Sequence, residues 1–285
     1  MKQEFTRIAV KVGSNVLTRR DGTLDVTRMS ALVDQIAELH KSGVEIILIS
    51  SGAVASGRSE VHPQKKLDSV DQRQLFSAVG QAKLINRYYE LFREHNIPVG
   101  QVLTTKESFG TRRHYLNQKN CMTVMLENNV IPIVNENDTI ATYELNFDKD
   151  NDTLIGDNDT LSAIVSALVE ADLLILLSDI DGLYTDDPRK NPNATFIDTV
   201  EKLNDTYMSM GKESTGSNGT AGMNTKMTAA KIATNVGADM VIANSKDIGI
   251  LHRIINGEKE GTLFVAHKDE TFDLPTFVDQ LHKHD

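Results

Sequence analysis

Residues 44–52, with the sequence Val-Glu-Ile-Ile-Leu-Ile-Ser-Ser-Gly, contain the pattern that decides the fold. The residues before the Ser-Ser-Gly end form a nearly continuous apolar and β-branched run, which is typical of a strand buried on both faces of a sheet. An amphipathic helix is predicted just before it, with apolar residues at three- and four-residue spacings from Met29 to Leu39, Thr27 as its N-cap and Gly43 after its last turn. The stretch is therefore a helix–strand unit of an α/β protein.

The same alternation of helix and strand continues along the chain. Further strands are predicted at residues 8–12, 99–103, 130–134, 173–177, 240–243 and 262–265, and long helices at about 70–94, 160–170 and 223–236. Continuously apolar strands separated by helices predict a mostly parallel sheet covered on both faces. Such sheets bind ligands outside the carboxyl ends of their strands. Most of the distinctive polar residues follow predicted strands, so we expect the functional site at that edge of the sheet.

The composition is that of an ordinary globular protein of 285 residues, 40% hydrophobic and 25% charged. Its 40 acidic residues outnumber the 30 basic ones, and the formal charge of -10 argues against a nucleic-acid partner. No apolar run is long enough to span a membrane, and no secretory signal follows Met1, so a cytoplasmic protein without membrane contact is expected. The single cysteine, Cys121, has apolar neighbours that predict a buried core position rather than a nucleophile.

The first two predicted strands end in residues that suit an anion. Lys11 lies between apolar neighbours just before Gly13, and a lysine in a buried strand is costly unless its charge meets an anion. Residues 50–57 are small and lead into a helix, so their backbone N–H groups favour a phosphate or a carboxylate. A surface lysine and an ordinary tight turn would explain the same residues. The spacing of a Walker A loop occurs nowhere in the chain.

The middle of the chain is richer in polar residues. Residues 135–138, Asn-Glu-Asn-Asp, follow a predicted strand directly and project from its carboxyl end. The pattern Asp-Asn-Asp-Thr-Leu then occurs at 150–154 and again at 157–161, and only the second copy leads into an amphipathic helix. We therefore assign the functional role to residues 157–159, whose carboxylates also suit a helix N-terminus. An N-cap with solvated neighbours would explain one aspartate but not the whole polar set.

Two later segments suit a nucleotide. Ser178 and Asp179 follow the strand at 173–177 and precede a turn-rich stretch. Residues 216–226 join a glycine-rich loop to a helix that carries Lys226 near its start. Glycines let a backbone approach phosphate oxygens closely, and a helix N-terminus adds positive potential. A flexible linker is the alternative, although linkers seldom lead straight into an amphipathic helix.

These segments occur in the order and context typical of the amino-acid kinase family, within which the chain most closely resembles the glutamate 5-kinases. The resemblance extends over about residues 7–266, and its most specific part is the pair of segments 135–138 and 156–159. Aspartate, acetylglutamate, carbamate and uridylate kinases share the fold but differ there. The resemblance implies a three-layer α/β/α sandwich with a mostly parallel central sheet.

The resemblance also implies a domain plan. Residues 1–267 would form the amino-acid kinase domain, whose N-terminal half binds the substrate and whose C-terminal half binds ATP. Residues 268–285 would be a C-terminal tail, for which no element is predicted, and no PUA domain is expected after it. The loop that contains the repeat at 150–154 is longer than in many relatives, and its effect is left open.

Individual residues receive roles from the same resemblance. Lys11 and Lys226 would contact the transferring phosphoryl group, and Asp159 would hold both lysines in place. The substrate would be bound by Ser51, Gly52, Asn135, Asp138 and Asn158, with Asp138 as the partner of its ammonium group. ATP would be bound by Lys11, Ser178, Asp179, Thr220, Ala221, Gly222, Met223, Asn224, Thr225 and Lys226. No residue is assigned as a metal ligand. Asn15 and Ala221 depart from the family pattern without removing a charge.

The implied reaction is phosphorylation of the γ-carboxylate of L-glutamate by ATP with Mg²⁺, giving L-glutamyl 5-phosphate, the first step of proline biosynthesis. A carboxylate is already a nucleophile at neutral pH, so the protein would align two anions and neutralise the charge that spreads over the transferred group. Family members are commonly homo-oligomers, here a dimer or tetramer, and proline is the expected feedback inhibitor. Coupling to glutamyl phosphate reductase is left open.

Two other functions remain as alternatives. The first keeps the fold and changes the acceptor to another acyl or amino-acid substrate. The second is a nucleotide-sensing regulator that has lost catalysis. The joint presence of Lys11, Asp159 and Lys226 argues against the regulator, because a protein that only binds nucleotide does not need all three.

Overall fold

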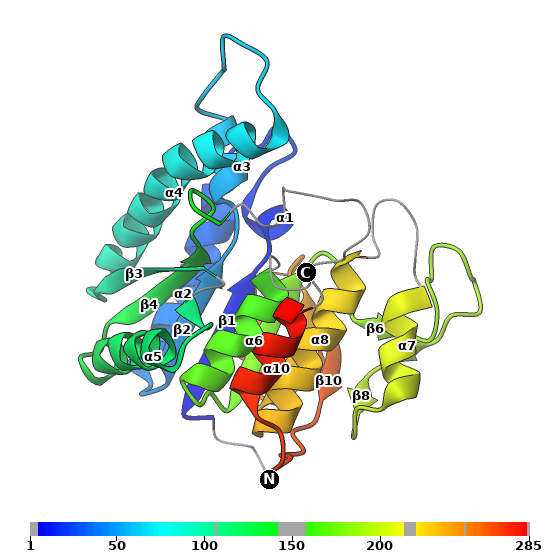
Figure 1. The fold of residues 1–285 in the computed structure, drawn as a ribbon. Helices are drawn as coiled ribbons and strands as arrows, with labels where there is room; N and C mark the ends of the chain where they lie inside the picture. The colour runs from blue at the N-terminus through cyan, green and yellow to red at the C-terminus, as the bar shows by residue number, and fades with distance from the viewer. Residues whose placement is uncertain (1–4, 106–107, 142–157, 214–220, 248, 284–285) are drawn as a thin grey trace.

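The computed structural model describes residues 5–105, 108–141, 158–213, 221–247 and 249–283, which are built around one central sheet (Figure 1). The order of its strands is β3-β4-β2-β1-β5-β9-β10-β8. Their bounds are β1 (Arg7–Val12), β2 (Glu45–Ser50), β3 (Val99–Thr104), β4 (Ile131–Glu136), β5 (Leu173–Ser178), β8 (Thr199–Val200), β9 (Asp239–Asn244) and β10 (Thr262–Phe264). The first six strands in this order, β3, β4, β2, β1, β5 and β9, run parallel to one another. Strand β10 runs antiparallel to β9 and parallel to β8. The prediction of a mostly parallel sheet is confirmed.

Helices cover both faces of the sheet and complete the predicted three layers (Figure 1). One face packs against α2 (Val26–Lys41), α4 (Ser69–Glu94) and α9 (Ile250–Ile255). The other packs against α5 (Arg112–Glu127), α6 (Asn158–Leu168), α8 (Ala221–Val236) and α10 (Leu274–Lys283). The short helices α1 (Ser14–Leu17) and α3 (Ala53–Arg58) follow β1 and β2, and α7 (Asp205–Glu213) packs on α8. Strands β6 (Leu183–Tyr184) and β7 (Phe196–Ile197) form a small antiparallel pair.

The alternation of side chains along β1 decides where its lysine points. Ile8, Val10 and Val12 belong to the core on the α2 and α4 side, whereas Ala9 belongs to the core on the α6 and α8 side. Successive residues of a strand point to opposite faces. Lys11 therefore shares the face of Ala9 and points toward α6 and α8 at the carboxyl end of the strand.

Two local expectations need correction. Thr27 is not the N-cap of α2, because the side chain of Asp25 accepts the hydrogen bond from the Arg28 backbone. Cys121 is exposed, not buried, since α5 turns Met122 toward the core and leaves its neighbour on the outer side.

The C-terminal tail forms a helix that sequence patterns did not reveal. In α10, Leu274 and Val278 lie one helical turn apart and are both buried against the core on the α6 and α8 side. No helix in the described ranges is long and apolar enough to cross a lipid bilayer.

Candidate active site

Three charged side chains from three elements meet at the carboxyl end of β1. The Nζ atom of Lys11 lies 2.5 Å from Oδ1 of Asp159, and Nζ of Lys226 lies 2.7 Å from Oδ2 of the same carboxylate. Asp159 belongs to the first turn of α6, where a helix favours negative charge, and Lys226 belongs to α8. All three residues are at most 8% exposed. One buried carboxylate thus holds two ammonium groups, which leaves a net positive charge.

The environment keeps Asp159 ionised. Burial alone would raise the pKa of Asp159, but the ammonium groups of Lys11 and Lys226 outweigh it and hold that pKa below its ordinary value. The hydroxyl of Thr225 also donates to Oδ2, at 3.3 Å, and Nζ of Lys226 donates to the carbonyl oxygen of Gly222, at 3.2 Å. Both oxygens of Asp159 are therefore engaged, which fits a group that positions cations rather than a general base.

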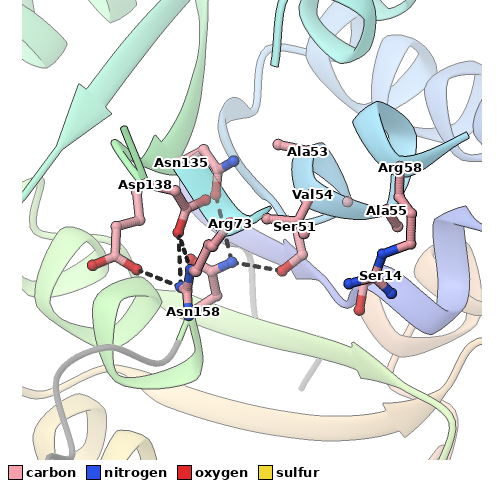
Figure 2. A pocket seen from close by; sticks show the side chains of 12 residues that line it. Ser14, Ser51, Ala53, Val54, Ala55, Arg58, Arg73, Asn135, Asp138 and Asn158 are labelled. Atoms are coloured by element: carbon pink, nitrogen blue, oxygen red, sulfur yellow. Dashed lines mark hydrogen bonds and ion pairs between the residues drawn. The ribbon is translucent and has the colours of Figure 1, made fainter. Parts of the chain in front are cut away.

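A cavity of about 280 Å³ lies beside this group, at the carboxyl ends of β2 and β4. Gly52 lines it and separates β2 from α3 with a φ of 105°, a left-handed conformation that glycine adopts without strain. Figure 2 shows Arg73, Asn135, Asp138 and Asn158 grouped on one side of the cavity. The lining residues are Ser14, Ser51, Gly52, Ala53, Val54, Ala55, Arg58, Arg73, Asn135, Glu136, Asp138 and Asn158.

Amide groups fix the wall of the cavity nearest to Asp159. Nδ2 of Asn158 donates to Oγ of Ser51 at 2.7 Å and lies 3.5 Å from Oδ1 of Asn135. The amide of Asn135 in turn donates to Oε1 of Gln81, at 2.8 Å, so α4 supports this wall. Oδ1 of Asn158 is buried and has no hydrogen-bond partner among the described residues. A donor on a bound molecule would satisfy this acceptor.

The same cavity contains a salt bridge between Asp138 and Arg73. Nε and an Nη atom of Arg73 lie 2.9 Å and 2.7 Å from Oδ1 of Asp138, and that Nη atom is 3.6 Å from Glu136. Asp138 is only 8% exposed. The arginine comes from α4, and both acids come from the end of β4 and the turn after it. The cluster places one cation between two carboxylates.

The carboxyl end of β5 carries a second polar group. Oδ2 of Asp179 accepts a hydrogen bond from the amide of Asn15, at 2.9 Å, and Oδ1 accepts one from the hydroxyl of Ser178, at 3.3 Å. Partial burial would raise the pKa of Asp179, but the hydrogen bond from Asn15 and the smaller contributions of Ser178 and Lys226 keep it below its ordinary value. Asn15, a departure from the family pattern, thus orients an aspartate that was expected to bind ATP.

The structure brings most of the expected residues together in two adjoining groups. Lys11, Asp159, Thr225, Gly222 and Lys226 form the charged group, whereas Ser51, Gly52, Asn135, Asp138 and Asn158 line the cavity. The others are less directly placed. Met223 packs against the core, and the backbone of Asn224 accepts a hydrogen bond from Thr228 inside α8. Ala221 is the first residue of α8. Thr220, Asp157 and the repeat at 150–154 lie outside the described residues.

Sequence analysis missed three residues at the cavity: Arg58, Arg73 and Gln81. All three come from helices α3 and α4 rather than from strand ends. The distinctive polar residues of the sequence follow strands, whereas charged residues on a helix are usually solvated, so no pattern singled out these three. One signal could have identified Arg73 as a site residue. It is a charged residue one turn into the amphipathic helix α4, and that helix comes after the turn of small residues at 50–57.

The chain is similar to known kinases over most of its length. The family model described as the amino acid kinase family matches residues 6–244. A glutamate 5-kinase of Bacteroides thetaiotaomicron is 67% identical over 253 residues, covering 88% of this chain and 67% of that protein. A glutamate 5-kinase of Clostridium acetobutylicum is 42% identical over 259 residues, covering 91% of this chain and 94% of that protein.

Solved structures support the fold at low sequence identity. A UMP kinase from Bacillus anthracis aligns with a TM-score of 0.58 and 16% identity, covering 92% of this chain and 97% of that one. An isopentenyl phosphate kinase aligns with a TM-score of 0.58 and 19% identity, covering 91% of this chain and 100% of that one. At these identities the likeness concerns the fold alone.

Proposed function

This chain belongs to the amino acid kinase family, and from that premise we propose that it transfers the γ-phosphoryl group of ATP to the γ-carboxylate of L-glutamate. The product is L-glutamyl 5-phosphate, whose formation begins proline biosynthesis. The observation that carries the proposal is the buried carboxylate of Asp159 holding Lys11 and Lys226 beside a cavity that contains Asp138. The relatives named glutamate 5-kinase support the choice of acceptor.

The proposed chemistry needs no general base. A glutamate side chain has a pKa near 4.3, so its γ-carboxylate is ionised at neutral pH. One of its oxygens attacks the γ-phosphorus, the bond to the bridging oxygen breaks, and ADP leaves with the electron pair. Negative charge spreads over the transferred group, and Lys11 and Lys226 are the ammonium groups that neutralise it. Asp159 fixes the separation and direction of the two lysines.

The cavity suits the amino-acid end of glutamate. Asp138 and the unpartnered Oδ1 of Asn158 are acceptors for the substrate ammonium group, which the two lysines would repel. Ser51 and Asn135 hold the amide of Asn158 in place, and Gly52 lets the backbone approach the substrate closely. The substrate then lies with its ammonium group at Asp138 and its γ-carboxylate toward the lysines.

ATP is assigned to the other side of the charged group. Ser178 and Asp179 at the end of β5, together with residues 220–226, are the proposed contacts to the nucleotide. The described part of that segment, from Ala221, opens α8, whose N-terminal backbone favours phosphate. With ATP bound in this way, its γ-phosphate lies next to Lys226, between the rest of the nucleotide and the cavity.

Mg²⁺ is proposed to arrive with ATP. Within the described residues no group of three or more His, Cys, Asp or Glu side chains is arranged so that it could hold a metal ion. Mg²⁺ bound to a nucleotide is commonly held by phosphate oxygens, water and only one or two carboxylates, so such a group is not required. When bound, Mg²⁺ neutralises part of the negative charge of the phosphates. The lysine–aspartate group carries a single net positive charge and cannot neutralise all of it.

The resemblance to glutamate 5-kinases supports further proposals about regulation and assembly. We propose a cytoplasmic homo-oligomer, a dimer or tetramer, that proline inhibits and that passes its unstable product to glutamyl phosphate reductase. Sedimentation with and without proline tests the oligomeric state. Turnover at increasing proline concentrations tests the inhibition by proline.

Turnover with Mg-ATP and hydroxylamine, which traps acyl phosphates as hydroxamates, tests the main proposal. We expect hydroxamate with L-glutamate and little with aspartate, N-acetylglutamate or carbamate. Signal with another carboxylate alone would replace the acceptor. Tight ATP binding with no turnover on any acceptor would favour the regulator. Lys226→Met should abolish most of the signal, whereas Lys231→Met, on the exposed side of the same helix, should not.

A further inference from the structure

Arg73 is a charged residue of the cavity to which the proposed mechanism gives no role. It comes from α4, and its guanidinium contacts Asp138 through two nitrogens, at 2.9 Å and 2.7 Å. Both contacts fall on Oδ1 of that carboxylate, and no described residue donates a hydrogen bond to its Oδ2. Figure 2 shows the pair side by side at the edge of the cavity, together with Asn135 and Asn158.

Two nitrogens on one oxygen define the direction of a carboxylate better than a single contact does. A guanidinium is planar and presents its donors in a fixed fork, unlike the point charge of a lysine. Asp138 is 8% exposed, so it has little water to orient it. With Oδ1 held against Arg73, the second oxygen is the one available to a ligand.

Charge balance supports the same conclusion. Asp138 and Glu136 would form a doubly negative pair without the guanidinium, which lies 3.6 Å from Glu136 as well. With Arg73 the three side chains carry a single negative charge. Within this group the guanidinium offsets the repulsion between the two carboxylates, and the carboxylate of Asp138 stays an acceptor suited to an ammonium group.

We propose that Arg73 is a positioning residue for substrate selection, which orients Asp138 so that the site prefers an acceptor with an ammonium group over the same dicarboxylate without one. The inference rests on the proposed function and adds a determinant of specificity on helix α4. Arg73 acts through Asp138. It need not touch the substrate.

Comparing L-glutamate with glutarate, the same dicarboxylate without the amino group, tests the inference. For Arg73→Met we expect the preference for glutamate, measured as the ratio of kcat/KM values or of competitive inhibition constants, to fall about 10- to 100-fold, the usual effect of losing a charged hydrogen bond. Affinity for glutarate and the KM for ATP should change less than threefold. Arg73→Lys, which retains the charge but not the fork, should give an intermediate loss. Arg87→Met, which removes another arginine of α4 paired with Glu90, is the matched control and should retain the preference.

A double-mutant cycle shows whether Arg73 acts through its partner. On an Asp138→Asn background, Arg73→Met should cause no further loss of glutamate preference, because the group that it positions is already gone. Additive losses, or equal weakening of glutamate and glutarate, would overturn the inference, and so would an unchanged or increased preference in a folded Arg73→Met protein. If the wild type fails to phosphorylate glutamate, the proposed function is wrong. If the wild type phosphorylates glutamate but Arg73→Met leaves the preference for glutamate over glutarate unchanged, only this inference is wrong.

Discussion

At the scale of single residues, Asp159 is the group on which the rest of the site depends. It is 1% exposed and is the shared counter-ion of Lys11 and Lys226. Removing one partner from a buried ion pair leaves an uncompensated charge and commonly costs about 3–5 kcal/mol. The aspartate is therefore expected to matter for both folding and turnover.

Asp159→Asn should lower kcat about 10²- to 10³-fold, because the two ammonium groups lose the anchor that aims them at the transferring group. The KM for glutamate should change much less, since Asp138 and Asn158 remain. Steady-state kinetics measure both constants, and Ser162→Ala, which removes only a hydroxyl bonded to the backbone of the same helix, is the control. A variant with near wild-type kcat would contradict the assigned role.

The same residue predicts a pH dependence of stability. The pKa of Asp159 in the folded protein is below its ordinary value of 3.8, so the ionised carboxylate stabilises the fold above that pH. This contribution is lost as the pH falls through the folded-state pKa. The difference in unfolding free energy between wild type and Asp159→Asn should therefore be constant at neutral pH and shrink below pH 3.8. Denaturant unfolding at several pH values measures it, and a gap that widens in acid would contradict the account.

At the scale of elements, the packing of α3 on α4 sets the shape of the cavity. A Cβ atom on Gly80 would lie 1.8 Å from the carbonyl oxygen of Ala53, and one on Gly57 would lie 1.8 Å from that of Phe76. The obstacles are backbone atoms, so the helices can only move apart. Because α3 follows Gly52 directly and α4 carries Arg73, this crossing holds two walls of the site.

Gly80→Ala should therefore destabilise the protein by about 1–3 kcal/mol, the usual cost of overpacking, and also raise the KM for glutamate. Gly257→Ala is the control, since its φ of 80° adds strain but no atom lies within 4 Å of the new Cβ. That control should lose stability without a change in KM. Thermal unfolding together with glutamate saturation curves separates the two effects, and an unchanged KM in Gly80→Ala would refute the link between crossing and site.

The elements were largely predictable from sequence because their signals are local. Apolar runs predicted strands β1, β2 and β5. Period-2 alternation places Lys11 on the same face as Ala9, but only the structure shows that α6 and α8 cover that face. Helix α10 was missed because its buried face is marked by only a few apolar residues among those described, Leu274, Phe277 and Val278. Arg73 was missed for a different reason. Its importance comes from a partner 65 positions away, and no local pattern encodes that contact.

At the scale of the whole molecule, the C-terminal helix joins the layer of α6 and α8, which carry Asp159 and Lys226. Helix α10 lies beside α6 and α8 (Figure 1). Leu274 and Val278 pack into the same core as these helices, and Nζ of Lys231 lies 5.4 Å from the centre of the Phe277 ring. Residues 268–283 are therefore part of the folded domain in this structure rather than a free tail. The division into a substrate half and a nucleotide half stays a prediction.

Val278→Ala should lower the unfolding free energy by about 1–3 kcal/mol, because the side chain is 2% exposed and leaves a cavity. Turnover by the folded protein should remain close to wild type, since Val278 packs in the hydrophobic core and is not among the residues that line the cavity. Denaturant titration followed by kinetics well below the midpoint tests both statements. Thr276→Ala, at an exposed position of the same helix, should show only the small effect of a lost cap contact. Equal losses in the two variants would mean that α10 is not docked.

The central claim is that a carboxylate oxygen of glutamate attacks the γ-phosphorus of ATP at the group formed by Lys11, Asp159 and Lys226. The most direct test uses L-glutamate labelled with ¹⁸O in its γ-carboxylate, with hydroxylamine present and the released phosphate analysed by mass spectrometry. Because hydroxylamine attacks the acyl carbon, the account predicts phosphate that contains one ¹⁸O atom from the wild type and almost none formed by Lys226→Met. Unlabelled phosphate from the wild type, formed at the same rate as ADP, would show that water is the acceptor and would contradict the claim.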